Sequence, residues 1–282
     1  MQRCGLAADW LPAWRRILTP TVSLEGIRHS FGGAPVLDGI SFSVHPGEVL
    51  GIVGPGGCGK SLLLKIIAGL VRPQEGSVHV LGEDILALES LDMVHVRSKM
   101  GMLFQNYALF DFLTVGENAG FPLLQAPENK GKDKKKMVMG RVSELLKKLG
   151  LGGTERLYPN ELSGGMRKRV GLARATIHEP ELILYDDPSA GLDPVTSSKI
   201  FGLIDAIHDA TASTEIIVSH DVDRMHAVCD RFLLLHKGNI HFEGTLKEAE
   251  EHRDDPVVHA FFFREQASSE PTGMASPPPV PQ

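Results

Sequence analysis

Apolar and polar residues alternate in two segments near the start of the sequence. The segments are VSLEGIRHSF (22–31) and ISFSVH (40–45), and a Gly-Gly-Ala-Pro sequence follows the first of them. Alternation of this kind is typical of strands that bury one face, and glycine and proline between two such runs favour a turn. The pattern predicts an antiparallel pair of strands and therefore a β subdomain.

Three other short segments are apolar nearly throughout. They are VLGIV (49–53), LILY (182–185) and EIIVS (215–219). Strands that are buried on both faces of a parallel sheet have such runs, so these segments predict an α/β core. A further hairpin is expected over residues 231–244, with its turn at Lys237-Gly238-Asn239.

Residues from about 91 to 161 are expected to be mostly helical. This stretch ends in VSELLKKLGL (142–151), whose apolar spacing and closing glycines fit an amphipathic helix. The basic run GKDKKK (131–136) lies inside it. A solvated loop or helix end is the usual explanation of such a run, and contact with anionic lipid head groups is the alternative.

The composition is that of an ordinary globular protein. The chain has 282 residues, 42% of them hydrophobic, which is enough for a sizeable core and suggests one or two domains. A net charge of −6 argues against a nucleic-acid-binding surface spread over the whole molecule. The three cysteines are far apart in the sequence and cannot form a disulfide framework, which indicates a reducing compartment.

The sequence contains no apolar run near the roughly 20 residues that a transmembrane helix needs. The richest run, residues 61–71, has Lys65 in its middle, so we expect any role at a membrane to depend on a partner. Residues 1–20 lack the apolar centre of a signal peptide and are expected to form an N-terminal extension. Its Trp10 and Trp14 fit either a loosely docked arm or a short amphipathic helix on a membrane or partner.

Residues 54–61, GPGGCGKS, match the pattern of a phosphate-binding P-loop between a strand and a helix. Glycines let backbone N–H groups surround phosphate oxygens, and the helix N-terminus adds positive potential. Lys60 is expected to reach the β- and γ-phosphates and Ser61 to bind Mg²⁺. Cys58, close to that helix N-terminus, is expected to have a stabilised thiolate and raised reactivity. The expected nucleotide-binding residues of the loop are Gly54, Gly56, Gly57, Cys58, Gly59, Lys60 and Ser61.

A dinucleotide-binding site is the alternative, because Gly54, Gly56 and Gly59 also match G-x-G-x-x-G. The Lys-Ser pair after the last glycine decides against it. The acidic residue that such a site needs at the end of its second strand is also missing, since Glu75 precedes the apolar run 77–81.

Two later segments extend the candidate site. LILYDD (182–187) places Asp186 at a strand end, where a carboxylate holds Mg²⁺ beside a P-loop. LSGGMRKRVGLARA (162–175) offers a Ser-Gly-Gly turn that opens a basic helix, which is a second phosphate site. One chain therefore carries two half-sites, and a head-to-tail pair of chains is expected to hold two nucleotides between them.

The order of GPGGCGKS, Gln105, LSGGM, LILYDD, AGLD (190–193) and His220 resembles the nucleotide-binding subunit of an ABC transporter over roughly residues 21–245. The resemblance implies an α/β fold, a P-loop NTPase with a mainly parallel core sheet, an antiparallel β subdomain and a helical subdomain at about 91–165. Residues 246–265 are then expected to be a C-terminal helical segment. Residues 266–282, rich in Ser and Pro, are expected to be disordered.

The resemblance also implies roles for residues outside the phosphate loop. Phe31 would stack on adenine, Gln105 would sense Mg²⁺ and the γ-phosphate, and His220 would contact the γ-phosphate. Ser163, Gly164 and Gly165 would clamp the nucleotide of the opposite chain, and Asp193 would link the two sites. Each also has a structural interpretation, since Phe31 fits a core position, Gln105 a loop amide and His220 a strand-end histidine. The cofactors implied are ATP and Mg²⁺.

Asp187 departs from the family pattern, because ABC ATPases usually have glutamate there to polarise the attacking water. Aspartate is shorter by one C–C bond, about 1.5 Å, so slow but measurable hydrolysis is expected. With Lys60, Gln105 and His220 it completes the expected catalytic set. The departure also leaves open a nucleotide-dependent switch with little turnover.

Three segments narrow the resemblance further. They are similar to segments in the ATPase of Mla-type, or MCE-linked, phospholipid transport systems. The three are LSGGM followed by Arg-Lys-Arg, residues 100–123, and DPVVHAFF (255–262). This implies a homodimer with ATP at its interface, bound to integral-membrane permease subunits at the cytoplasmic face of the inner membrane, with an MCE-type lipid-binding protein beyond the membrane. An ABC importer or exporter of another substrate is the alternative.

The sequence argues against a nucleic-acid-associated ATPase and against a zinc site. The ABC ATPases that act on DNA or ribosomes carry long coiled coils or two ATPase units, and this sequence has neither, so no nucleic-acid partner is expected. His220, His226, Cys229 and His236 fit no standard zinc spacing, and no transition metal is assigned to them.

Overall fold

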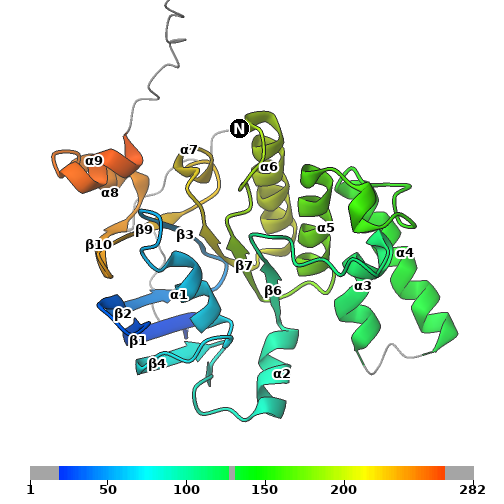
Figure 1. The fold of residues 1–282 in the computed structure, drawn as a ribbon, viewed down its shortest axis with the longest axis horizontal. Helices are drawn as coiled ribbons and strands as arrows, with labels where there is room; N and C mark the ends of the chain where they lie inside the picture. The colour runs from blue at the N-terminus through cyan, green and yellow to red at the C-terminus, as the bar shows by residue number, and fades with distance from the viewer. Residues whose placement is uncertain (1–18, 127–130, 264–282) are drawn as a thin grey trace, which may run out of the picture.

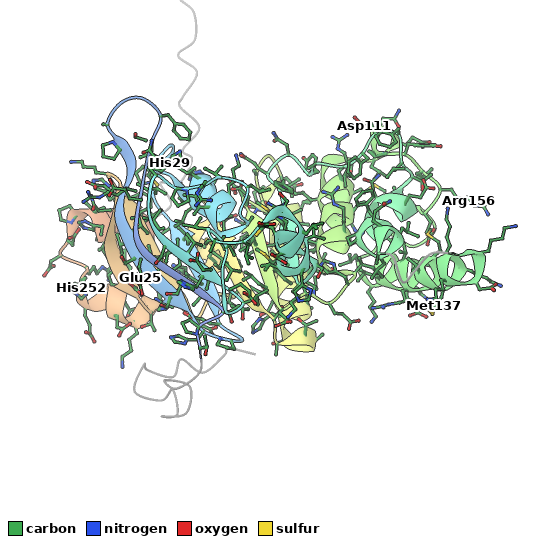
Figure 2. The ribbon with its side chains drawn as sticks, turned by 90° about the horizontal axis from the view of Figure 1, so that it is seen from below. Glu25, His29, Asp111, Met137, Arg156 and His252 are labelled. Carbon is green, nitrogen blue, oxygen red and sulfur yellow. The ribbon has the colours of Figure 1, made fainter. Side chains whose placement is uncertain are left out.

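The structure is a computed structural model that describes residues 19–126 and 131–263. The proposed arm around Trp10 and Trp14 and the Ser- and Pro-rich tail lie outside the described residues. Two sheets organise the described part of the chain, with strand orders β2-β1-β4-β5 and β10-β9-β3-β8-β7-β6. Figure 1 shows both sheets beside a group of helices formed by α3, α4 and α5. Figure 2 places His252 at one end of the molecule and Met137 and Arg156 at the other.

The smaller sheet is antiparallel. It consists of β1 (Val22–Ser30), β2 (Pro35–Val44), β4 (Glu75–Val80) and β5 (Glu83–Asp84). The antiparallel pair predicted from the alternating pattern is therefore confirmed. The register shifts between Leu24 and Ile27, where Gly26 has a φ of 62° and its N–H donates to Ser41 Oγ at 2.8 Å.

The larger sheet is mainly parallel, as the short apolar runs predict. Its strands are β3 (Val49–Val53), β6 (Met100–Leu103), β7 (Leu182–Asp186), β8 (Thr214–Val218), β9 (Arg231–His236) and the antiparallel β10 (Asn239–Gly244). Alternate residues of one strand enter two separate cores. Leu182 and Leu184 pack toward the smaller sheet, whereas Ile183 and Tyr185 join the core with the helices on the other face. Strands buried on both faces can therefore be apolar throughout.

Each face of the larger sheet is covered by different helices. The core with the smaller sheet includes α1 (Lys60–Ile67) and α2 (Ser90–Ser98). The opposite core includes α3 (Val115–Gln125), α4 (Lys132–Lys148), α5 (Gly164–Thr176), α6 (Pro194–Thr211), α7 (Val222–Met225), α8 (Leu246–Glu251) and α9 (Pro256–Phe262).

The expectation of a mostly helical stretch from 91 to 161 is wrong at Met100–Leu103, which forms the edge strand β6. A side chain at Gly101 would collide with the carbonyl oxygen of Ala175, so glycine allows this strand to lie close to α5. A four-residue apolar run has no period that separates strand from helix. The helix predicted at 142–151 begins earlier, at Lys132, and the basic run forms its exposed first turns.

The hairpin predicted at 231–244 is confirmed. Its turn residues Lys237 and Gly238 have φ values of 48° and 82°, as a tight hairpin turn requires. The C-terminal helices pack on this hairpin, and the ring of Phe262 lies 5.4 Å from that of Phe232. Among the residues that the structure describes, no helix has the length and apolar character needed to cross a bilayer.

The loop that precedes α3 is held by one buried amide. Asn118 is fully buried, its Oδ1 accepts from Phe110 N–H at 2.8 Å, and its Nδ2 donates to the carbonyls of Phe110 and Leu113 at 3.0 Å. The helix begins with a capping box in which Thr114 and Glu117 bond each other's backbone N–H. Together these bonds fix the conformation of residues 110–114.

Replacement of Asn118 by alanine is expected to lower the free energy of unfolding by about 2–3 kcal/mol, because it leaves a cavity at a fully buried position and removes the partners of the half-buried Phe110 N–H and Leu113 carbonyl. Denaturant titration of the full chain measures this. Glu144→Ala, an exposed position on α4, is the control and is expected to change stability by less than about 0.5 kcal/mol. Equal midpoints for the two variants would contradict the assigned role of Asn118.

Candidate functional site

The loop between β3 and α1 needs its glycines for geometric reasons. Gly54, Gly57 and Gly59 have φ values of 148°, 76° and 102°. A side chain at Gly54 would collide with the carbonyl oxygen of Leu235, and one at Gly59 would lie 2.7 Å from Leu37. In contrast, a Cβ at Gly56 or Gly57 would meet nothing within 4 Å. The loop is therefore packed against the protein on one side and open on the other, where its backbone is accessible to an anion.

Lys60, the first residue of α1, bends back over this loop. Its Nζ donates to the carbonyls of Gly54 at 2.8 Å and Pro55 at 2.9 Å, and the side chain is buried. A cation next to accessible backbone N–H groups at a helix N-terminus is an arrangement suited to a phosphate group.

Ser61 and Asp186 meet although 125 positions separate them. Ser61 Oγ donates to Asp186 Oδ1 at 2.7 Å, and Asp186 is buried at the end of β7. A hydroxyl and a carboxylate oxygen are ligands that Mg²⁺ prefers. The structure thus brings two of the three predicted metal ligands together. The third, Gln105, is exposed in the loop after β6, and its backbone carbonyl accepts from Lys168 Nζ.

Asp187 has a left-handed backbone conformation with a φ of 46°. Its N–H donates to the carbonyl of Val218 at 2.8 Å, and its Oδ1 accepts from Ser219 Oγ at 3.1 Å. Aspartate tolerates this conformation better than most residues with a side chain. The Asp187 carboxylate is therefore held next to Asp186, and His220, directly after Ser219, is exposed at the same edge of the sheet.

The Ser-Gly-Gly turn opens a helix as predicted. Ser163 caps α5, its Oγ accepts from Met166 N–H at 3.3 Å, and Gly164 and Gly165 form the first turn. Ser163 is exposed, so the N-terminal end of α5 is accessible from solvent. A Cβ at Gly165 would lie 2.7 Å from the Thr196 side chain, so α5 and α6 approach closely here. In Figure 1 this helix lies apart from α1, and the two candidate phosphate sites belong to separate elements.

Asp193 caps α6. Its Oδ1 accepts from the N–H groups of Val195 and Thr196 at 3.0 Å, and its Oδ2 accepts from Thr196 Oγ1. The hydrogen bond from the Thr196 hydroxyl, with those from the backbone, lowers the pKa of Asp193 below its ordinary value. The residue therefore has a local structural role in the single chain.

Phe31 lies in the turn between β1 and β2 and is 73% exposed. Its ring makes an edge contact with His29 at 4.8 Å. The core position considered for Phe31 is therefore wrong. An exposed aromatic ring held against a second ring is accessible for stacking on a planar ligand.

Sequence reasoning missed Lys168, which is fully buried within the basic helix α5. Its Nζ donates to the carbonyls of Gln105 at 2.8 Å and Asp187 at 3.0 Å. Burial lowers the pKa of Lys168 to about 8, against the opposing effect of Asp187 and Asp186. Lys168 precedes the buried Gly171 and Leu172 by three and four residues, so the three share one face of the helix. This spacing could have indicated burial, but the position of Lys168 between two arginines is equally typical of a basic surface.

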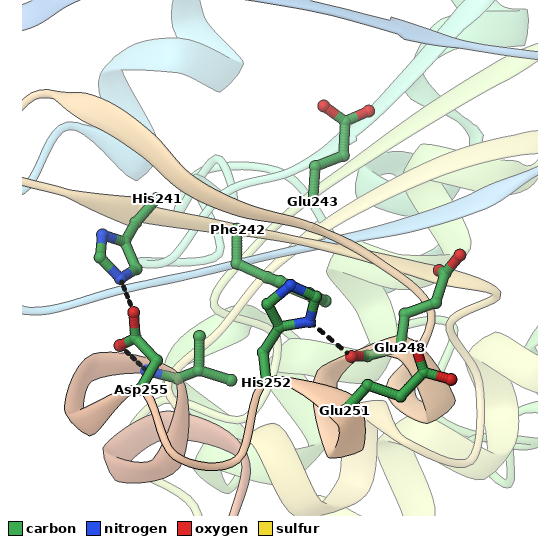
Figure 3. Close-up of a pocket in the computed structure, with 8 residues that line it drawn as sticks. His241, Phe242, Glu243, Glu248, Glu251, His252 and Asp255 are labelled. Carbon is green, nitrogen blue, oxygen red and sulfur yellow. Dashed lines mark hydrogen bonds and ion pairs between the residues drawn. The ribbon is translucent and has the colours of Figure 1, made fainter.

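A pocket of about 410 Å³ lies elsewhere, between β10 and the C-terminal helices. Figure 3 shows His241 and Asp255 paired at its edge, with a separation of 3.0 Å between Nε2 and Oδ2. His252 Nδ1 lies 3.0 Å from the carbonyl oxygen of Glu248. The pocket contains none of the phosphate-loop residues and does not belong to the candidate nucleotide site.

Comparisons with known proteins agree with this geometry. Residues 37–190 match the ABC transporter family. The chain is 37% identical over 240 residues to the probable ribonucleotide transport ATP-binding protein mkl of Mycobacterium leprae, which covers 85% of this chain and 68% of that protein. It is 37% identical over 256 residues to the chloroplastic protein TRIGALACTOSYLDIACYLGLYCEROL 3 of Arabidopsis thaliana (85% and 72%). It is 38% identical over 230 residues to the methionine import ATP-binding protein MetN of Caulobacter vibrioides (82% and 68%). The chain thus spans about two thirds of the length of these relatives.

Two solved structures share the fold. The ATP-binding cassette MJ0796, described as a dimer in a post-hydrolysis state with ADP and Pi, has a TM-score of 0.73 at 30% identity and covers 79% of this chain and 98% of its own. The protein cbiO1 from Clostridium perfringens, part of the transporter complex cbiONQ, has a TM-score of 0.72 at 25% identity (86% and 99%). The predicted α/β fold of a P-loop NTPase is therefore confirmed.

The expectation of a stabilised thiolate at Cys58 is wrong. Burial raises the pKa of the Cys58 thiol above its ordinary value, an effect larger than the opposing one of the Lys60 cation. The side chain is turned inward, where its Sγ would lie 2.9 Å from a Cβ at Gly54. The thiol therefore lies on the packed side of the loop and away from the open one.

Alkylation of Cys58 by iodoacetamide at pH 7.5 is expected to be slower than that of a free cysteine and to accelerate as the pH rises above 9, because only the thiolate reacts. Peptide mass spectrometry measures the modification of each cysteine separately. The same reaction in denaturant is the control and is expected to remove the difference. Rapid modification of folded protein at neutral pH would show that the thiol is not shielded.

Proposed function

The chain belongs to the ABC transporter family, and from this premise we propose that its ATP hydrolysis powers a membrane permease that moves phospholipids. The ATPase activity itself follows from the family and from the cassettes that share the fold. The main support for a nucleotide site at this loop is the 2.7 Å hydrogen bond from Ser61 Oγ to Asp186 Oδ1, next to the open side of the phosphate loop.

ATP is proposed to bind with its phosphates on the open side of residues 54–59, where backbone N–H groups and Lys60 neutralise their charge. Ser61 and Asp186 are the proposed residues for Mg²⁺, with Gln105 from the loop after β6. The fit rests on hard oxygen donors that already lie within hydrogen-bond distance of each other. When bound, Mg²⁺ would offset charge on the β- and γ-phosphates.

Hydrolysis is assigned to Asp187 and His220. Asp187 is proposed to polarise the attacking water, since Ser219 holds one of its carboxylate oxygens and leaves the other available. His220, one residue beyond Ser219, is proposed to contact the γ-phosphate. The short side chain of Asp187 is compatible with slow turnover, so a nucleotide-dependent switch is the second candidate.

The active form is proposed to be a head-to-tail homodimer. Ser163, Gly164 and Gly165 lie on α5, away from the chain's own phosphate loop, and the N-terminus of α5 is accessible. A second copy would place that N-terminus against the nucleotide, with Phe31 stacked on the adenine and Asp193 near both sites. The description of MJ0796 as a dimeric cassette supports this arrangement.

The loop before α3 is the proposed contact with the permease. Phe112 is 77% exposed there, and its ring lies 5.7 Å from that of Phe110, in the segment that Asn118 fixes. A rigid loop with an exposed aromatic side chain is suited to insertion into a partner. We assign the subunit to the cytoplasmic face of the inner membrane, as a peripheral protein below its permease.

Phospholipid as substrate rests on the resemblance of residues 100–123 and 255–262 to the ATPases of MCE-linked systems. The name of the Arabidopsis relative contains a galactolipid, which supports a lipid substrate in general. An MCE-type lipid-binding protein is then a further proposed partner. The names of the other relatives specify ribonucleotide and methionine transport, so another substrate is the alternative.

Asp187→Glu is expected to raise ATP turnover by about tenfold, since a misplacement on the order of 1 Å can cost about a hundredfold in rate. Asp187→Asn is expected to reduce turnover to near background and to trap an ATP-bound dimer. Phosphate release and size-exclusion chromatography with ATP measure the two effects. Lys60→Ala is the control, because it is expected to lose both turnover and the ATP-dependent dimer. Full activity of the asparagine variant would remove Asp187 from the proposed mechanism.

Purification of the tagged full chain from a detergent extract of membranes is expected to recover a multispanning permease, an MCE-type protein and bound phospholipid. Phe112→Asp, which places a charge in the proposed permease contact, is the matched control and is expected to lose the permease while keeping ATP binding. Recovery of a permease with a periplasmic amino-acid-binding protein instead would assign a different substrate and overturn the phospholipid proposal.

A further inference from the structure

Lys168 joins three segments that are distant in the sequence. It lies on α5, five residues after the cap Ser163, and its side chain is fully buried. Its Nζ donates to Gln105 O at 2.8 Å and to Asp187 O at 3.0 Å, and it lies 5.0 Å from the centre of the Tyr107 ring. Figure 1 shows α5 beside β6. The two carbonyls belong to residues that follow the ends of β6 and β7.

Burial of an ammonium group is costly unless its surroundings compensate. Here the two carbonyl oxygens, the face of Tyr107 and the charges of Asp186 and Asp187 favour the protonated form. Both carbonyls belong to the backbone of residues with proposed roles at the γ-phosphate. The hydrogen bonds therefore act on the main chain and leave the Gln105 side chain and the second carboxylate oxygen of Asp187 available to a ligand.

The backbone of Asp187 is fixed from both sides. Its N–H bonds to Val218 of β8, and its carbonyl bonds to Lys168 of α5. Between these bonds the residue has its left-handed φ of 46°. The Asp187 carbonyl also accepts from the Ala190 N–H at 3.1 Å, a bond within the following turn. Loss of the bond from Lys168 would leave only this local bond on the carbonyl and would detach the turn from α5. A small rotation of that peptide moves the carboxylate relative to the phosphate loop.

We propose that Lys168 is a positioning residue for ATP hydrolysis, which ties the main chain of Asp187 to that of Gln105 and to α5. Through these hydrogen bonds, a movement of α5 against a nucleotide would shift the main chain of Asp187, the residue proposed to polarise water. The inference rests on the proposed role of Asp187 and adds a residue that touches neither nucleotide nor water.

Arg174 provides a matched comparison. It lies on the same helix, and its guanidinium donates to the carbonyls of Ala108 at 2.6 Å and Tyr107 at 2.7 Å. Arg174 thus holds the loop that follows Gln105 by two backbone carbonyls, as Lys168 does, but its bonds do not reach Asp187. Removal of either cation disturbs the loop, and only removal of Lys168 breaks the hydrogen bond between α5 and Asp187.

The test compares Lys168→Met and Arg174→Met in the full chain, with kcat at saturating MgATP, the Kd for ATP and thermal unfolding measured for each. Lys168→Met is expected to lower kcat at least tenfold with the Kd for ATP changed less than threefold, because the phosphate loop is untouched. Arg174→Met is expected to keep kcat within threefold. Lys168→Arg, which retains a donor, is expected to recover part of the loss and serves as the second variant if the methionine variant does not fold.

A double-mutant cycle with Asp187→Asn distinguishes the two proposals. If Lys168 acts through Asp187, its removal from the Asp187→Asn variant lowers the residual single-turnover rate less than twofold. An undiminished kcat in Lys168→Met, equal losses in Lys168→Met and Arg174→Met, or a full loss in the double variant would each overturn the inference. Full activity of Asp187→Asn alone would instead contradict the proposed function.

Discussion

The hydrogen bond between Ser61 and Asp186 depends on a single constraint, the parallel alignment of β3 and β7. The carboxyl ends of parallel strands lie at the same edge of a sheet, and β8 between them keeps that alignment through its pairing with both. The phosphate loop leaves β3 at this edge, and Asp186 ends β7 there. Asp187, Ser219 and His220 follow the ends of β7 and β8, so all of the proposed hydrolytic groups come from one sheet edge.

Side chains from the helices on the other face of the larger sheet also fix the backbone around this site. The buried cation Lys168 joins α5 to the loop after β6 and to Asp187, whereas Arg174 joins α5 to the next residues of the same loop. Asn118 then fixes the part of this loop that carries the exposed Phe112. A continuous set of backbone contacts thus connects the proposed permease contact with the proposed hydrolytic group. Two of these carbonyls also accept from a backbone N–H, that of Asp187 from Ala190 and that of Phe110 from Leu113, so the side-chain donors add to local turns and stiffen the connection.

The shorter Asp187 gives this arrangement a particular consequence. A side chain with one fewer C–C bond has less freedom to correct a displaced backbone, so the position of its main chain has more weight than it would for glutamate. The left-handed φ and the hydrogen bonds to Val218, Ser219 and Lys168 restrict that position. In the proposed mechanism, turnover would therefore depend on backbone geometry as well as on the chemistry of the carboxylate.

The sequence by itself determined the parts of the protein that local physics controls. The GPGGCGKS pattern predicted the phosphate loop, short apolar runs predicted the parallel sheet, and a serine before two glycines predicted the start of α5, because each depends on a few neighbouring residues. Only the tertiary structure decided that Met100–Leu103 is an edge strand, that Cys58 is shielded and that Lys168 is buried against two distant carbonyls. These properties arise from groups that lie far apart in the chain, and neither hydrophobic periodicity nor motif spacing records how burial and hydrogen bonding change the energy of a thiol or an ammonium group.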